Sequence, residues 1–174
     1  MTSEPTRSRQ HPDTPSREAI HAEFETARAT FHAALRSLGE AGWRRKSANP
    51  AWTNAEVLAH AAGYLTLLPR FVSGARKGKG FPRPPLLASR WLSIWLARWA
   101  ARNTTPRSLA RTYEAGHATA LILLAGIRDD EWHNGATFPS GYQTVESFFR
   151  IHARHVAEHA AQLRVSSPDS AGNR

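Results

Sequence analysis

The chain of 174 residues contains no cysteine. This absence excludes disulfide bonds, thiol catalysis and thiolate metal sites, so any bound metal must be held by histidine, carboxylate or water. The first ten residues are polar and contain no apolar stretch typical of a secretory signal. No apolar run is long enough and sufficiently free of charge to span a bilayer. We therefore expect a soluble, cytoplasmic protein.

Acidic residues are missing from the whole of Val57–Tyr113, which contains ten lysines and arginines. This segment carries a charge of +10, the rest of the chain about −1, and the total is +9. The basic character therefore belongs to one surface. It predicts either solvated arginines on helix faces or attraction of an anionic ligand, nucleic acid or membrane.

The apolar residues recur with the helical period of 3.6 and almost nowhere alternate as in a strand. We expect an all-α protein, an antiparallel four-helix bundle with an extra short helix in the long connection between main helices two and three. The domain should span 16–165, between disordered tails at 1–15 and 166–174.

Local signals predict where these helices begin and end. The first should follow Ser16 and stop at Gly39. The second should open with a capping box, Thr53 to Glu56, and be kinked or ended by Pro69. The short helix should cover about 86–102, the next should begin at Thr105–Pro106, and the last should run from Thr144 to about 165, after a loop at 129–142.

The last helix carries the strongest chemical signal. Its predicted core-facing stripe consists of Val145, Phe148, His152, His155 and His159. Buried imidazoles need partners, and His155 and His159 lie one helical turn apart, a spacing that suits two nitrogens binding one metal ion.

His60 is the best candidate for a third ligand, because it is the one histidine of the second helix and borders its apolar stripe. Three imidazoles and an open position are typical of catalytic metal sites, and Zn²⁺ or Ni²⁺ suits such ligands. His155 to His159 also spells H-x-x-E-H, the inverted zinc-protease motif. We reject a protease because only Asp169, in the predicted tail, could supply a downstream carboxylate ligand.

The remaining histidines have less specific interpretations. His152 could contact the metal ligands or substrate, or be a core residue bonded to a carbonyl group. A further set is expected to be surface or satisfied core residues: His11, His21, His32, His117 and His133.

Three segments resemble the DinB-like superfamily of four-helix-bundle metalloenzymes, which includes the metal-binding domain of mycothiol-dependent maleylpyruvate isomerases. Trp52-Thr53-x-x-Glu56-Val57-x-x-His60 resembles the family's motif at the start of helix two. His155-x-x-Glu158-His159-x-x-Gln162 resembles its terminal motif, and the loop Asp129–Trp132 with Gly141 and Thr144 resembles the segment before the last helix. The resemblance implies a metal held by His60, His155 and His159, and the use of a low-molecular-weight thiol or a hydrolase activity.

Three functions follow as hypotheses. The first is a metal-dependent enzyme of the thiol transferase or hydrolase class that activates water or a low-molecular-weight thiol. In it, His152 or Tyr64 orients the substrate and basic residues of segment 70–111 receive an anionic small molecule. The second is a non-catalytic binding or tolerance protein on the same metal bundle.

The third hypothesis concerns the basic, tryptophan-rich insertion at 80–105. Its tryptophans and arginines could bind nucleic acid or an anionic membrane: Trp91, Trp95, Trp99, Arg90, Arg98 and Arg102. We favour the alternative that the tryptophans cap the bundle or form the face of a homodimer.

Overall fold

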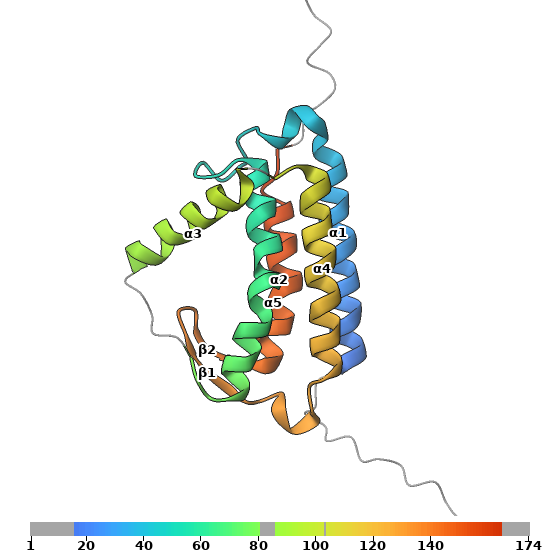
Figure 1. Ribbon diagram of the computed structural model, residues 1–174, viewed down its shortest axis with the longest axis vertical. Helices are drawn as coiled ribbons and strands as arrows, with labels where there is room; N and C mark the ends of the chain where they lie inside the picture. The colour runs from blue at the N-terminus through green and yellow to red at the C-terminus, as the bar shows by residue number, and fades with distance from the viewer. Residues whose placement is uncertain (1–15, 81–85, 103, 165–174) are drawn as a thin grey trace, which may run out of the picture.

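Four long helices lie side by side and form the body of the protein (Figure 1). The computed structural model describes residues 16–80, 86–102 and 104–164, with the backbone alone at 86–93. The bundle helices are α1 (Arg17–Trp43), α2 (Asn54–Arg76), α4 (Pro106–Ala125) and α5 (Val145–Ala160). The predicted all-α four-helix bundle is confirmed. The two predicted tails lie outside the described residues.

The chain direction of each helix can be followed by colour in Figure 1. Helices α1 and α5 run one way, and α2 and α4 run the other way. Helix α2 packs against α4 and α5, and α1 packs against the same two helices. The pairs α2–α5 and α1–α4 are therefore antiparallel. The parallel pair α2–α4 arises because α3 (Leu86–Ala101) carries the chain back to the end where α2 begins.

Helix starts follow the predicted caps. The hydroxyl of Thr53 accepts a hydrogen bond from the Glu56 amide at 3.3 Å, and the Glu56 carboxylate accepts one from the Thr53 amide at 2.7 Å. Thr105 and Thr144 cap α4 and α5 in the same manner, each with a serine three residues later. These bonds satisfy amide groups that have no partner inside the helix.

Three predicted helix ends differ from the structure. Helix α5 ends at Ala160 and not, as predicted, near 165. Helix α2 continues through Pro69 to Arg76. Of the two predicted effects of Pro69, a kink or the end of the helix, the second is therefore wrong. Buried Leu65, Leu68 and Val72 flank the proline, and their packing holds the helix together despite the lost backbone bond. Gly39 does interrupt α1, with φ of 55°, but a short helical segment follows and reaches Trp43.

The segment predicted as a loop at 129–142 contains regular structure, which corrects that prediction. A 3₁₀ turn, η1 (Asp129–Glu131), precedes a hairpin of β1 (Gly135–Phe138) and β2 (Gly141–Thr144). The strands are antiparallel, in a register that pairs Gly135 with Thr144 and Phe138 with Gly141. The Phe138 ring is buried and meets Phe148 of α5 edge-on, with ring centroids 4.8 Å apart, so the hairpin is attached to the bundle.

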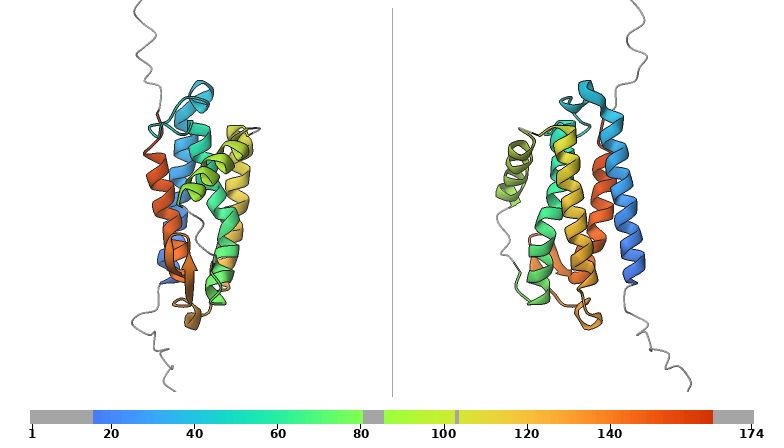
Figure 2. Two further views of the ribbon diagram at one scale, coloured as in Figure 1. Left: turned by 90° about the vertical axis from the view of Figure 1, so that its left-hand side faces the viewer. Right: turned by 45° about the vertical axis from the view of Figure 1, so that its right-hand side comes forward.

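Helix α3 lies outside the bundle, on the side of α2 that faces away from α1 (Figures 1 and 2). Its buried Ala97 packs with Trp52 and Val57, whereas Trp95 and Trp99 are 62% and 65% exposed. The prediction that the tryptophans cap the bundle is therefore wrong for these two residues, and the side chain of Trp91 lies outside the described part. Across the described ranges, no helix combines the length and apolar character needed to cross a bilayer.

Candidate metal centre

Three histidines converge where α2 faces α5. His60 comes from α2, and His155 and His159 come from successive turns of α5. One ring nitrogen of each can be chosen so that all three lie within 4.8 Å of one another. The ring centroids are 5.0 Å apart for both pairs that include His60, and 4.4 Å apart for His155 and His159. The structure thus brings together the three residues predicted as metal ligands.

Neighbouring side chains hold these rings in place. The indole of Trp52 lies 4.7 Å from the His60 ring and 5.8 Å from the His159 ring, measured between centroids. Gln162 places its side-chain oxygen 3.3 Å from Nδ1 of His159. This contact favours a proton on Nδ1 of His159. The lone pair of the ring then lies on Nε2, which can bind a metal ion.

All three imidazoles are held in the neutral form. Burial, and next the charge of His159, lower the pKa of His60 to about 4. Burial, and next the neighbouring histidines His159, His60 and His152, lower the pKa of His155 to about 3. Burial also lowers the pKa of His159. Neutral imidazole is the form that binds a metal ion, so the site needs no deprotonation near neutral pH.

His152 lies on α5, one turn before His155, and its Nε2 has a hydrogen-bond partner. It is fully buried, and its Nε2 is 3.0 Å from the hydroxyl of Tyr113. Burial, and next the charge of His117, lower its pKa to about 3. Tyr113 was not predicted as a site residue, because its position in the α4 stripe reads as ordinary core.

Tyr64 links this part of the core to the three histidines. Its ring lies 5.4 Å from the ring of His155 and 5.9 Å from that of His152, measured between centroids. Its hydroxyl donates a 2.7 Å hydrogen bond to the carbonyl of Phe148. Burial raises the pKa of this phenol. Tyr64 therefore stacks on His152 and lies beside His155 at a tilt of 44°, while its hydroxyl is engaged elsewhere.

The other histidines lie apart from the three. His21 and His133 are exposed, and His11 lies outside the described residues. His32 contacts Glu114, and the buried His117 has its Nε2 3.4 Å from a carboxylate oxygen of Glu25. Among the described residues, only His60, His155 and His159 form a cluster that could hold a metal ion.

Glu158, the acid of the H-x-x-E-H pattern, does not join the three histidines. Its side chain is 60% exposed and lies 3.7 Å from Arg154. A protease of the inverted zinc type would need this carboxylate at the reacting centre.

The fold and the site together define the class of the protein: a four-helix bundle with a candidate three-histidine metal site. Residues 23–163 match the DinB superfamily, and the chain belongs to that superfamily. The resemblance drawn from the sequence motifs is thereby confirmed.

Two solved structures share the fold. The crystal structure of a mycothiol-dependent maleylpyruvate isomerase is 18% identical, with a TM-score of 0.69 over 88% of this chain and 62% of that chain. A histidine-to-alanine mutant of a mycothiol-dependent maleylpyruvate isomerase is 17% identical, with the same TM-score and coverage. The chain thus spans less than two thirds of these proteins. No curated protein matches the sequence.

Proposed function

We propose that His60, His155 and His159 bind one divalent metal ion, Zn²⁺ or Ni²⁺, at the α2–α5 contact. The observation that carries the proposal is the convergence of three imidazoles from two helices, with one nitrogen of each within 4.8 Å of the others. Among the described residues, the rings of His60 and His155 make no side-chain hydrogen bond of their own. Partly buried imidazoles that face one another without partners are costly unless a ligand joins them.

The donor set fits such an ion. Imidazole nitrogens are good ligands for Zn²⁺ and Ni²⁺, and no thiolate competes in a chain without cysteine. Nitrogens bound to one tetrahedral Zn²⁺ at about 2.1 Å lie about 3.4 Å apart. The three nitrogens here lie within 4.8 Å of one another, so an ion that binds them would draw the rings closer together.

We further propose that the protein is a thiol transferase or hydrolase that acts on a small, anionic molecule. A divalent ion held by three imidazoles lowers the pKa of a coordinated water or thiol toward neutrality. The fold shared with a mycothiol-dependent enzyme and the absence of cysteine support an external low-molecular-weight thiol. A cytoplasmic location belongs to the same proposal, because that compartment keeps small thiols reduced.

In this proposal the residues beside the histidines position the substrate. Tyr64 supplies an aromatic ring next to His155, with its hydroxyl fixed on the Phe148 carbonyl. His152, tied to Tyr113, keeps the core below the site closed to water. Tyr64 orients the substrate, His152 holds the Tyr64 ring and excludes water, and neither donates a proton in the proposed reaction.

Metal analysis of purified protein tests the ligand assignment. The variants His60→Ala, His155→Ala and His159→Ala should each lower metal occupancy sharply. The controls His133→Ala, at an exposed position, and His117→Ala, at a buried one, should retain the metal. Full metal retention in the double variant His155→Ala, His159→Ala would overturn the assignment.

A panel of low-molecular-weight thiols and hydrolysable esters then tests the activity. Turnover that disappears with the metal supports the enzyme. If the protein binds one of these compounds at one molecule per chain but does not convert it, the enzyme hypothesis is wrong. The alternative, a non-catalytic binding or tolerance protein, then takes its place. His152→Gln should keep the metal and lower the activity.

A further inference from the structure

A pocket lies between the end of α3 and the start of α2, and none of the three clustered histidines lines it. Its volume is about 380 Å³, within the range of small-molecule sites. The lining residues are Arg44, Thr53, Glu56, Trp95, Arg98, Trp99, Ala101 and Arg102. No histidine lines it, and Trp52 packs between the inner face of α3 and the His60 ring.

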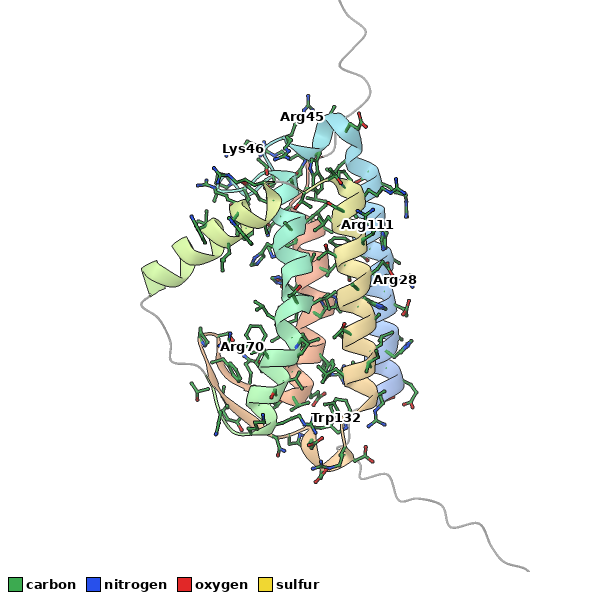
Figure 3. All side chains as sticks on the ribbon, in the orientation of Figure 1. Arg28, Arg45, Lys46, Arg70, Arg111 and Trp132 are labelled. Atoms are coloured by element: carbon green, nitrogen blue, oxygen red, sulfur yellow. The ribbon has the colours of Figure 1, made fainter. Side chains whose placement is uncertain are left out.

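The pocket is positively charged. Arg44 comes from the end of α1, Arg98 and Arg102 come from α3 and the residue after it, and Glu56 is the single acid of the lining. Figure 3 shows the α1–α2 connection, with Arg45 and Lys46 labelled, at the same end of the molecule. The lining therefore carries a charge of +2, and its α3 side, from Trp95 to Arg102, belongs to the acid-free segment.

Hydrogen bonds hold two of these guanidinium groups in position. Arg98 donates to the carbonyl of Ala51 at 3.2 Å, and its Nε is 3.9 Å from the Glu56 carboxylate. Arg44 donates to the carbonyl of Arg102 at 3.3 Å. Each guanidinium has five donors, so these contacts leave donors free for an anion.

The aromatic wall of the pocket is exposed: Trp95 is 62% and Trp99 65% accessible. Trp95 and Trp99 lie one turn apart on α3, while the small residues Ala97 and Ala101 of the same helix are buried. In its described part, the helix thus packs on alanine and presents Trp95 and Trp99 outward. Exposed indoles beside arginines are suited to stack a flat ring and to hold its charged group.

We propose that this pocket binds a small aromatic anion, a carboxylate or phosphate borne on a flat ring. The ring stacks on Trp95 or Trp99, and the anionic group pairs with Arg44, Arg98 and Arg102. The site is independent of the metal, because no lining residue belongs to the histidine cluster.

Calorimetric titration of metal-free protein with 2-naphthoate tests the proposal, and 2-naphthyl phosphate distinguishes the two anionic groups. The neutral 2-naphthylmethanol and the non-aromatic cyclohexanecarboxylate should each bind at least about tenfold more weakly, since each lacks one of the two interactions. The double variant Arg44→Gln, Arg102→Gln should weaken naphthoate by at least about tenfold. Trp99→Leu should weaken it several-fold.

Matched controls keep the result specific. Arg111→Gln removes an exposed arginine of the same acid-free segment, and Tyr142→Ala removes an aromatic residue that is 64% exposed. Both should bind like the wild type, and so should His155→Ala. Circular dichroism checks that every variant folds.

Several results would overturn the proposal. One is no binding of either naphthyl anion at about 1 mM, and another is equal binding by the double arginine variant. A third is loss of binding in His155→Ala, which would place the ligand at the histidines. A fourth is a homodimer, seen by light scattering, that Trp99→Leu dissociates. None of these results bears on metal occupancy, so the proposed function is tested separately.

Discussion

Acid should destabilise the metal-free protein well above the pH at which its carboxylates titrate. Burial holds the pKa of His60 at about 4 and the pKa values of His152 and His155 at about 3. In the unfolded chain each imidazole returns to a pKa of about 6.5. Between these values the unfolded state binds more protons than the folded state, so the free energy of unfolding falls as the pH falls.

The size of the effect follows from linkage. At pH 5.5 an unfolded imidazole is about ten-elevenths protonated, whereas the folded one is essentially neutral. Each of the three histidines then contributes about 1.4 kcal/mol less stability than at pH 7.5, or about 4 kcal/mol together. His159, whose pKa is also lowered, adds to the loss. A loss of this size is a large part of the 5–15 kcal/mol typical of a domain.

Urea unfolding at pH 7.5, 6.5 and 5.5, followed by circular dichroism in the presence of a chelator, measures the loss. The carboxylates of the unfolded chain are still almost fully ionised at pH 5.5, so the histidines dominate this window. His152→Gln should reduce the loss by about 1.4 kcal/mol, while His21→Gln, at an exposed position of α1, should not change it. Equal stability at pH 7.5 and 5.5 would refute the reasoning.

Three further predictions concern the metal and the packing of the bundle. Chelation should lower the melting temperature in calorimetry, because a metal at a hundredfold excess over its Kd stabilises the fold by about 2.7 kcal/mol. Glu131→Gln should lower the urea-unfolding free energy by about 1–3 kcal/mol, since its buried carboxylate holds Arg76 at 2.7 Å. Gly116→Ala should cost about 1–3 kcal/mol, because the added Cβ would lie 2.8 Å from Cβ of Leu65. Gly63→Ala, where the added Cβ meets nothing within 4 Å, should be neutral or stabilising in the same assay.

The periodicity of the last helix was the most informative pattern in the sequence. Val145, Phe148, His152 and His159 are buried as the stripe predicts. The pairing of α2 with α5, which completes the cluster with His60, does not follow from periodicity. A stripe indicates which face of a helix is buried but not which helix covers it. His60 was chosen because it is the one histidine of the second helix and borders its apolar stripe, and the family motifs then supported that choice.

The hairpin and the orientation of α3 were beyond the reach of the sequence patterns. Each strand has only four residues, too short for alternation to stand out, and the pairing depends on Gly141 at φ of 107°. In α3 the tryptophans repeat every fourth residue as a core stripe would. The helix instead buries Ala97 against Trp52, because small residues allow a close approach to the bundle.

The position of each histidine along α5 explains its different role. His152 lies where α4 supplies a tyrosine, so a hydrogen bond inside the protein offsets the burial of its Nε2, while its Nδ1 has no partner among the described residues. One turn further on, His155 faces α2. Its ring lies beside the imidazoles of His60 and His159, and in the described part of the chain no hydroxyl group takes the place that Tyr113 has beside His152. A bound cation can satisfy all three neutral rings at once, whereas a proton cannot do so without placing charge in a buried site. The same helix therefore provides both a structural imidazole and a candidate metal centre.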